Sequence, residues 1–241
     1  MTDLTPFFFI KTDLSKDEVR DLLKPLEPWR VKIGFSNGFD TETLETMRPW
    51  NTHPLYKLKM LADYVGMERL KSKRVLDIGF NAGYNSILLS QNFGCDVVGI
   101  DNNRLNLSKA EVLCDIAGAS PELLIADAHD FVSDPFDIVL HLGTLYHLQD
   151  PIKSMRTAAS NLKPGGMLVL ETTGCVGNDP LDCRLIYGWG GDTTNYWALG
   201  SRAIELILED AGLKNISVIK TLEPKVYEGS GLNRILLVAE R

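Results

Sequence analysis

The sequence contains no apolar run that approaches the length of a membrane-spanning helix, and its start, MTDLTPFFFIKTD, lacks the basic segment and long apolar core of a secretory signal. Its four cysteines show no CxxC pairing and no nearby histidine, which is typical of buried thiols in a reducing compartment. Basic residues number 25 against 32 acidic ones, and the net charge of −7 disfavours a broad nucleic-acid surface. We therefore expect a cytoplasmic protein with no membrane partner and no bound metal. Assembly into a homo-oligomer is compatible with these features.

The segment RVLDIGFNAGYNSILLSQNFGCDVVGID, residues 74–101, lacks the middle glycine of a GxGxxG fingerprint and the lysine of a P-loop. It does contain a buried-type strand, a glycine turn, an apolar stripe at helical spacing and a second strand that ends in Asp101. Gly79 allows a sharp turn, and Gly83 allows the following helix to pack closely on the sheet. The segment therefore predicts half of a nucleotide-binding βαβ unit.

Strand patterns alternate with helical patterns along the chain, which predicts an α/β fold: a Rossmann-like, mostly parallel seven-stranded sheet with helices on both faces. We expect an N-terminal extension and cap over residues 1–70 and a catalytic domain over 71–241. A substrate-side insertion near 174–200 has no periodicity, and long insertions of this kind are usually functional. The other expected strands are 123–126, 137–142, 167–172, 216–220 and 234–239, and the other expected helices are 14–26, 53–65, 105–117, 152–162 and 202–211, with KPGG closing the helix that ends near 162.

Acidic residues stand at the ends of three successive predicted strands, and ligands of such sheets bind beyond the carboxyl ends of the strands. Asp101 can accept both hydroxyls of a ribose. Asp127 can accept from an adenine amino group while the Ala128 N–H meets a ring nitrogen, and Asp77 suits an amine. Each acid has an alternative role as a helix cap or a loop solvator. The candidate cofactor-binding residues are Asp77, Gly79, Asn81, Gly83, Asp101, Asn102, Asp127, Ala128 and Leu142.

The pattern hydrophobic-Asp-x-Gly-x-x-x-Gly, with an acid closing the next strand and LKPGGMLVLE leading into a later one, resembles class I methyltransferases. This resemblance implies S-adenosylmethionine as cofactor and methyl transfer by in-line displacement, in which positioning supplies most of the acceleration. A nicotinamide oxidoreductase would use the same half-fold, but the short glycine spacing and the KPGG element disfavour it. A non-catalytic nucleotide-binding module is the alternative from another class.

More narrowly, GTLYHLQDP, VLETT and PWRVKIGFSNGFDTE are similar to the tRNA wobble-uridine carboxymethyltransferase (CmoB) family, a resemblance that covers most of the chain. In that family a lysine, a tyrosine and an arginine surround the carboxylate of carboxy-S-adenosylmethionine. The resemblance carries these roles to Lys32, Tyr146 and Arg234, the first across a gap, although Thr43 replaces a family tryptophan. Two cations and a phenol suit an extra carboxylate. They equally suit an acidic acceptor, or the two cations are simply solvated.

Histidines are the remaining candidates for acid–base chemistry. His147 follows the fourth core strand beside Tyr146, where a general base would help to deprotonate a hydroxyl acceptor. Its alternative role is a loop histidine bonded to a backbone carbonyl. His141 lies inside an apolar strand and is expected to be a core residue, whereas His53 and Glu171 are further candidates. We take His147 and Tyr146 as the catalytic pair.

The acceptor is not fixed by the sequence. Aromatic residues of the insertion, among them Tyr196 and Trp197, can enclose a ring or an apolar substrate, and with the acidic balance they favour a small molecule. A tRNA fits the family resemblance, and Arg30, Lys32 and Arg48 could form a local phosphate patch. We expect the small molecule, with Lys32, Arg234, Trp197 and Tyr196 as the substrate-binding candidates.

Overall fold

The computed structural model describes residues 9–29, 31–44, 54–177, 179–222 and 228–241. The chain divides into two compact units, Met1–Ile125 and Ala126–Arg241. The boundary near residue 70 that the sequence suggests stays a prediction.

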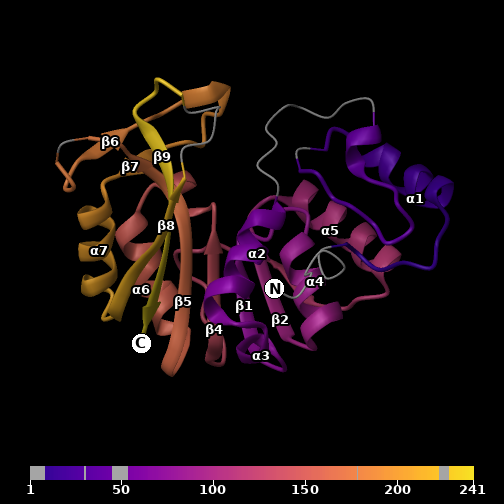
Figure 1. Ribbon diagram of the computed structural model, residues 1–241, viewed down its shortest axis with the longest axis horizontal. Coiled ribbons are helices and arrows are strands. Elements are labelled where there is room, and N and C mark those ends of the chain that lie inside the picture. The colour runs from indigo at the N-terminus through magenta and orange to yellow at the C-terminus, as the bar shows by residue number, and fades with distance from the viewer. Residues whose placement is uncertain (1–8, 30, 45–53, 178, 223–227) are drawn as a thin grey trace. The chain divides into compact units, whose positions relative to one another are not determined.

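The first unit is built on three parallel strands. β1 (Arg74–Ile78) pairs with β2 (Asp96–Asp101), and β2 pairs with β3 (Glu122–Ile125). α4 (Tyr84–Phe93) packs on β2, and α5 (Arg104–Ala117) packs on β2, β3 and α4 (Figure 1). The predicted βαβ unit is thus present. The remaining elements of this unit are α1 (Lys16–Leu23), the short 3-10 helices η2 (Lys24–Leu26) and η3 (Thr41–Thr43), α2 (Pro54–Val65) and α3 (Met67–Leu70).

The segment before β1 packs on the rest of the first unit. α1 begins at a capping box between Ser15 and Glu18 and contacts α5. The Trp29 side chain is buried and donates to the Leu23 carbonyl at 3.0 Å. Lys109 of α5 donates to the Pro28 carbonyl at 2.6 Å, and its ammonium lies 5.0 Å from the centre of the Trp29 ring. Trp29 and the backbone before it therefore pack on the core of the first unit.

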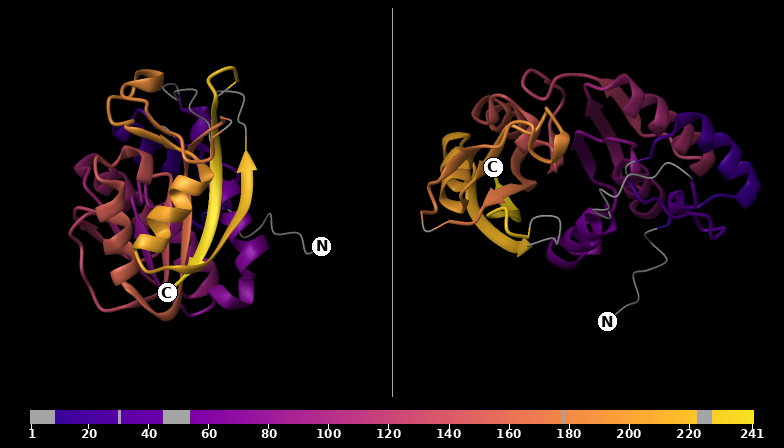
Figure 2. Two further views of the ribbon diagram at one scale, coloured as in Figure 1. Left: turned by 90° about the vertical axis from the view of Figure 1, so that its left-hand side faces the viewer. Right: turned by 90° about the horizontal axis from the view of Figure 1, so that it is seen from above.

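The second unit is a mixed sheet. β4 (Phe136–Leu142) pairs in parallel with β5 (Leu162–Cys175), and β9 (Leu232–Glu240) pairs with β5 in the antiparallel direction. β8 (Lys214–Leu222) runs antiparallel to β9, so the two lie side by side in Figures 1 and 2. Taken with the parallel strands of the first unit, these pairings confirm the predicted mostly parallel α/β fold. The helices of this unit are η4 (Leu145–His147), α6 (Pro151–Ser160), which packs on β5, and α7 (Ser201–Asp210), which packs on β8 and α6.

The described residues contain nine strands, not the predicted seven, because the insertion near 174–200 has regular structure of its own. β7 (Trp197–Leu199) pairs in parallel with the end of β5 and antiparallel with β6 (Cys183–Leu185), and η5 (Trp189–Gly191) lies between these strands in the sequence. Three-residue strands are too short to show a period of two. KPGG also lies within β5 and does not close the preceding helix.

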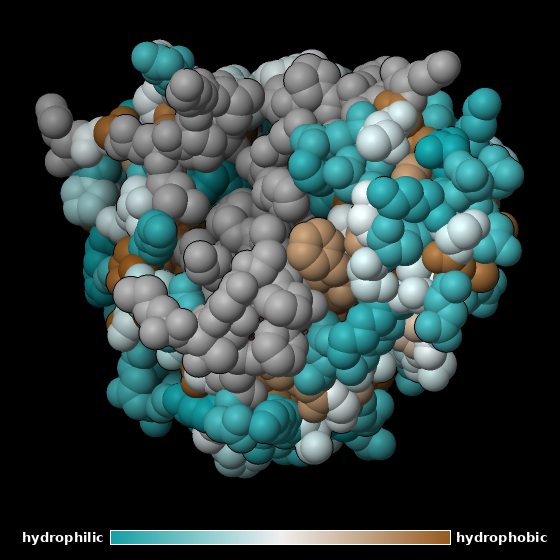
Figure 3. Space-filling view, turned by 45° about the vertical axis from the view of Figure 1, so that its right-hand side comes forward, coloured by the Kyte–Doolittle hydropathy of each residue, from teal (hydrophilic) through white to brown (hydrophobic). Residues whose placement is uncertain are grey.

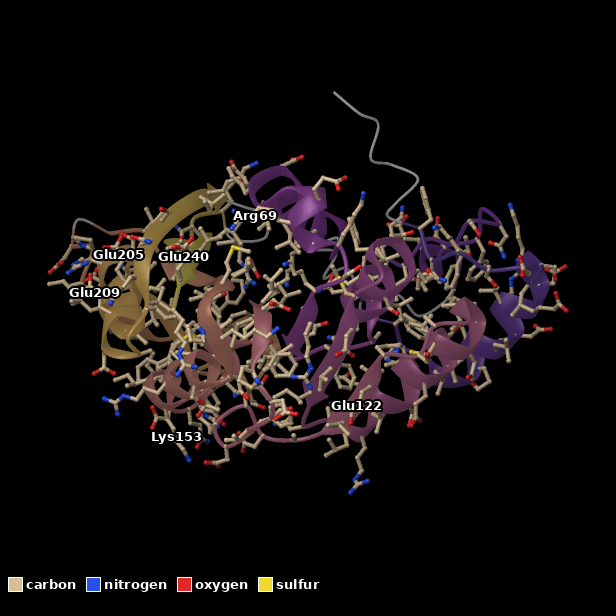
Figure 4. All side chains as sticks on the ribbon, turned by 90° about the horizontal axis from the view of Figure 1, so that it is seen from below. Arg69, Glu122, Lys153, Glu205, Glu209 and Glu240 are labelled. Carbon is tan, nitrogen blue, oxygen red and sulfur yellow. The ribbon has the colours of Figure 1, made fainter. Side chains whose placement is uncertain are left out.

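Charged side chains partner one another on the outer surface. Arg202 of α7 binds Glu205 at 2.9 Å and Glu209 at 2.8 Å, and Lys153 of α6 binds Asp130 at 2.6 Å. Figure 4 labels Lys153, Glu205 and Glu209 among these residues. On the described surface at the right of Figure 3, hydrophilic residues predominate and hydrophobic ones occupy small separate areas. No helix among the described residues has both the length and the apolar character needed to cross a membrane.

Candidate functional site

The turn between β1 and α4 adopts the backbone conformation that its residues predict. Gly79, Asn81 and Gly83 have φ angles of 76°, 55° and 76°, a region that glycine and asparagine tolerate best. The Gly79 N–H donates to the Ile100 carbonyl at 2.7 Å, and the Asn81 N–H donates to Asp101 Oδ2 at 2.9 Å. The turn is therefore hydrogen-bonded to the end of β2, which brings these predicted cofactor residues together.

Gly83 is required for a different reason from the one predicted. A Cβ atom at this position would lie 2.9 Å from the Cβ of Ala110 in α5. The close contact is thus between the start of α4 and the middle of α5, not between α4 and the sheet. Together with the positive φ, it leaves no room for a larger residue.

Asp101 is held in one orientation by its own chain. Its side chain, 9% exposed, accepts from the Asn81 N–H, from the Asn103 N–H at 2.8 Å and, with both oxygens, from Asn106 Nδ2 at 3.1 Å. Burial raises the pKa of Asp101, and these hydrogen bonds oppose that shift. The exposed Asn102 adjoins it. Sequence reasoning missed Asn106, although a polar residue in the first turn of the helix after a strand-end acid is a usable signal.

Asp77 lies inside the first unit. It is 1% exposed and accepts from the Ser86 hydroxyl at 2.7 Å. Burial raises the pKa of Asp77 to about 6, while the Ser86 hydrogen bond and the charge of Lys57 oppose the shift. Contact of Asp77 with the amine of a cofactor stays a prediction.

The basic residues of the N-terminal segment are described only in part. Lys32 forms an ion pair with Glu42, which raises the pKa of Lys32. Arg30, Arg48 and His53 lie outside the described residues. The phosphate patch proposed from the sequence is therefore reduced, among the described residues, to a lysine whose charge is compensated.

The first strand-end residues of the second unit make local contacts. Asp127 Oδ1 accepts from the His129 N–H at 2.8 Å and lies 2.7 Å from His129 Nδ1, and these contacts lower the pKa of Asp127. Ala128 is buried beside it, and Leu142 is buried at the end of β4. Asp127 thus binds within its own loop, in line with the alternative role given above for the strand-end acids. Its contact with an adenine stays a prediction.

A buried ion pair joins β5 and β9. Arg234, 4% exposed, donates through Nη2 to Glu171 Oε2 at 2.6 Å and through Nε to Oε1 of the same carboxylate. Its Nη1 donates to Thr173 Oγ1 at 2.8 Å, and the guanidinium carbon lies 4.7 Å from the centre of the Tyr146 ring. The antiparallel register, with Thr173 opposite Arg234, places these groups on one face. Tyr146 and Arg234 therefore meet, as the resemblance implies, but Glu171 compensates the guanidinium charge.

A cluster beyond β4, here called the loop cluster, joins η4 and the residues after it to the start of β7; its members are Tyr146, His147, Gln149, Tyr196 and Trp197. The Tyr196 N–H donates to the Tyr146 carbonyl at 2.8 Å, and the Gln149 amide donates to the Tyr196 hydroxyl at 3.0 Å. The Trp197 indole donates to the Gln149 carbonyl at 3.3 Å. The structure thus brings together four residues that the sequence proposed separately for catalysis and substrate binding.

His141 behaves as the predicted core residue. It is fully buried in β4, its Nε2 lies 3.3 Å from the Ser154 hydroxyl, and burial lowers the pKa of His141 to about 3. In the described part of the chain, no three or more His, Cys, Asp or Glu side chains are grouped so that they could hold a metal ion.

The chain is similar in sequence to proteins named tRNA U34 carboxymethyltransferase. The tRNA U34 carboxymethyltransferase of Desulfotalea psychrophila is 30% identical over 167 residues, 68% of this chain and 49% of that protein. The enzyme of the same name from Pseudoalteromonas translucida is 28% identical over 215 residues, 86% of this chain and 62% of its own length. The chain thus spans between about half and less than two thirds of these relatives.

Solved structures show the same fold. The N-terminal domain of EvdMO1, crystallised in the presence of SAH and D-fucose, superposes with a TM-score of 0.67 at 24% identity and covers 94% of this chain and 97% of that one. Phosphoethanolamine N-methyltransferase 2 of Haemonchus contortus superposes with a TM-score of 0.66 at 18% identity and covers 82% of this chain and 54% of that one.

The family follows from a match over most of the chain. Residues 52–218 match the family described as "Methyltransferase domain", and they make up more than half of the sequence. The chain therefore belongs to the methyltransferase domain family, and the predicted class, an S-adenosylmethionine-dependent methyltransferase of class I, is confirmed.

Proposed function

We propose that the protein transfers the methyl group of ordinary S-adenosylmethionine, not the carboxymethyl group of its carboxylated form, to a small-molecule acceptor. The buried pair of Arg234 and Glu171 carries this proposal. A cofactor carboxylate would need an uncompensated cation, whereas Glu171 binds two guanidinium nitrogens and neutralises the charge. Lys32, the second cation of the resemblance, is paired with Glu42.

The acceptor assignment is supported by the loop cluster and by a structural relative. Tyr146, Tyr196 and Trp197 gather beyond β4, and the Tyr187 ring lies 5.8 Å from that of Tyr196. Aromatic residues with a few placed polar groups are typical of sites for small organic ligands. The EvdMO1 domain, similar in fold, was crystallised in the presence of the sugar D-fucose.

The residues of the first unit fit the cofactor chemically. Asp101 is fixed by Asn81, Asn103 and Asn106, so its carboxylate is oriented before any ligand arrives. Two ribose hydroxyls are the donors that such a carboxylate suits, and a glycine in the turn allows a ligand to approach the backbone closely. S-adenosylmethionine supplies an electrophilic methyl group, and the protein contributes mainly binding and orientation.

Cofactor selection tests the proposal directly. In competitive calorimetry, wild type should bind S-adenosylmethionine at least as tightly as carboxy-S-adenosylmethionine. Glu171→Gln, which removes the compensating charge but keeps an acceptor for Arg234, should shift the preference toward the carboxylated form by about tenfold or more, as charged hydrogen bonds are worth about 1.5–3 kcal/mol. A strong wild-type preference for the carboxylated cofactor would contradict the proposal.

Asp101→Ala should weaken binding of S-adenosylmethionine by about tenfold to more than a hundredfold, because the ribose loses charge-assisted hydrogen bonds of about 1.5–3 kcal/mol. Isothermal calorimetry measures this loss. Asp96→Ala is the matched control, since Asp96 starts the same strand β2 and is exposed. Equal affinities of the two variants would refute the role of Asp101.

Carboxymethyl transfer to a tRNA wobble uridine is the second candidate. The names of the curated relatives and the contact of Tyr146 with Arg234 favour it. Incubation with carboxy-S-adenosylmethionine and tRNA, followed by mass spectrometry of the wobble nucleoside, distinguishes it from the first candidate. Formation of the carboxymethylated nucleoside at a rate above that of methyl transfer to any small molecule would favour it.

A further inference from the structure

Three side chains of the second unit form a hydrogen-bonded chain that ends on His147. His147 Nδ1 lies 2.9 Å from the Thr194 hydroxyl and 3.2 Å from the Thr194 carbonyl oxygen. The Thr194 hydroxyl donates to Asp192 Oδ1 at 2.6 Å, and the Thr194 N–H donates to the same oxygen at 2.9 Å. Asp192 and Thr194 belong to the insertion, 45 and 47 residues after His147.

These contacts fix the tautomer of the imidazole. A carbonyl oxygen only accepts, so its contact with Nδ1 requires a proton on that nitrogen. The Thr194 hydroxyl donates its hydrogen bond to Asp192 and therefore faces Nδ1 with a lone pair, which also requires a proton on Nδ1. The neutral ring therefore keeps its basic lone pair on Nε2. The negative charge of Asp192 also stabilises the protonated ring.

The ring is held in place from its other side as well. The centre of the imidazole lies 4.0 Å from that of the Tyr146 ring. The Tyr146 carbonyl accepts from the Tyr196 N–H, and the Tyr146 ring stacks with Arg234.

In the same turn as Thr194, the buried Asn195 has a side-chain oxygen with no hydrogen-bond partner in the described part of the chain. That oxygen is an acceptor for a polar hydrogen of a ligand.

We propose that Asp192 and Thr194 are positioning residues that hold His147 with Nδ1 protonated, so that Nε2 acts as the general base for a hydroxyl acceptor. The inference rests on the proposed function and names its acceptor class. Such a base is needed because a neutral hydroxyl attacks a methyl group poorly until its proton is removed. Thr194 and Asp192 act on this reaction only through the imidazole.

The transfer balances with these groups. The acceptor oxygen forms a bond to the methyl carbon of S-adenosylmethionine while the carbon–sulfur bond breaks, and its electron pair returns to sulfur to give the neutral thioether. The hydroxyl proton passes to His147 Nε2. The resulting imidazolium, stabilised through Thr194 by Asp192, then releases this proton to water.

Nuclear magnetic resonance tests the orientation without an acceptor. The chain has four histidines, so the signals of His147 must be assigned first. The sample is the full-length protein saturated with S-adenosylhomocysteine, and the ring-nitrogen signals that disappear in His147→Asn belong to His147. We expect the Nδ1–H pattern in wild type and in Thr194→Ser. Asp192→Asn should lower the pKa of the ring measured by pH titration of these signals, because the protonated ring loses a nearby negative charge. The Nε2–H tautomer in wild type would overturn the proposal.

Kinetics test the role in catalysis. Catechol, D-fucose and benzylamine, each supplied with radiolabelled S-adenosylmethionine, represent phenol, sugar and amine acceptors. His147→Asn keeps a donor near the Nδ1 position but lacks Nε2, so kcat on the hydroxyl acceptor should fall by about 100-fold or more while binding of S-adenosylhomocysteine is unchanged. Thr194→Val should lower kcat by roughly tenfold, and Thr194→Ser should keep kcat near that of wild type. Asp192→Asn should move the acidic limb of the pH profile of kcat/KM to lower pH.

The outcomes distinguish a failure of the base role of His147 from a failure of the proposed function. Methyl transfer to the amine alone, or unchanged kcat on a hydroxyl acceptor in His147→Asn, overturns the base role and leaves the methyltransferase standing. Failure to bind S-adenosylmethionine or S-adenosylhomocysteine contradicts the proposed function instead. The tautomer then still decides whether Asp192 and Thr194 orient His147.

Discussion

Arg234→Ala is expected to lower the free energy of unfolding by about 3–5 kcal/mol, because removal of one partner leaves a buried charge without compensation. The partner left behind is the Glu171 carboxylate, which is 1% exposed. Thr173 also loses the donor to its hydroxyl, and Tyr146 loses the guanidinium that stacks on its ring. Urea unfolding followed by circular dichroism measures the difference.

Arg202→Ala is the matched control on α7. Arg202 also binds carboxylates, those of Glu205 and Glu209, but its side chain is 42% exposed. Its loss should cost about 0–1 kcal/mol, as is usual for surface pairs. The double replacement Glu171→Leu with Arg234→Met, which removes both charges, should recover most of the stability lost in Arg234→Ala. A loss below about 1 kcal/mol for Arg234→Ala would show that the pair is not buried in solution.

The first unit could be read from its residues because its signals are local. Strand, turn and helix follow one another within residues 74–101. Gly79 and Gly83 have positive φ angles, which glycine adopts more readily than other residues. The placement of Asp101 at a strand end also follows from the sequence. Its partner Asn106 could have been proposed from its place in the first turn of the next helix, but the contact itself depends on how α5 turns its first residues toward β2.

The second unit was less predictable because its important contacts span long stretches of sequence. Arg234 meets Glu171 only through the antiparallel register of β5 and β9, and a register shifted by one residue would turn these side chains to opposite faces. His147 and Thr194 lie 47 residues apart and meet because β7 extends the sheet beside β5. The sequence indicated the residue types of this site, but not that Glu171 would compensate Arg234.

Replacing Asp77 by asparagine should change how the free energy of unfolding depends on pH. Burial raises the pKa of Asp77 from 3.8 to about 6, so the folded protein binds this proton more tightly than the unfolded chain does. Wild type therefore loses stability as the pH rises from about 4 to about 6, where the buried group becomes charged. Each unit of this difference in pKa is equivalent to about 1.4 kcal/mol. The free energy of unfolding therefore falls by about 3 kcal/mol in total.

Asp77→Asn never acquires the charge and keeps an acceptor for the Ser86 hydroxyl. The difference in unfolding free energy between variant and wild type should thus shift by about 3 kcal/mol in favour of the variant between pH 4 and pH 7. Urea titrations at unit pH intervals measure it, and other titrating groups cancel in the comparison. Ser86→Ala removes a hydrogen bond that stabilises the Asp77 carboxylate, so this variant should lose more stability than wild type over the same interval. Parallel curves for wild type and Asp77→Asn would show that folding does not raise the pKa of Asp77, which would contradict the prediction.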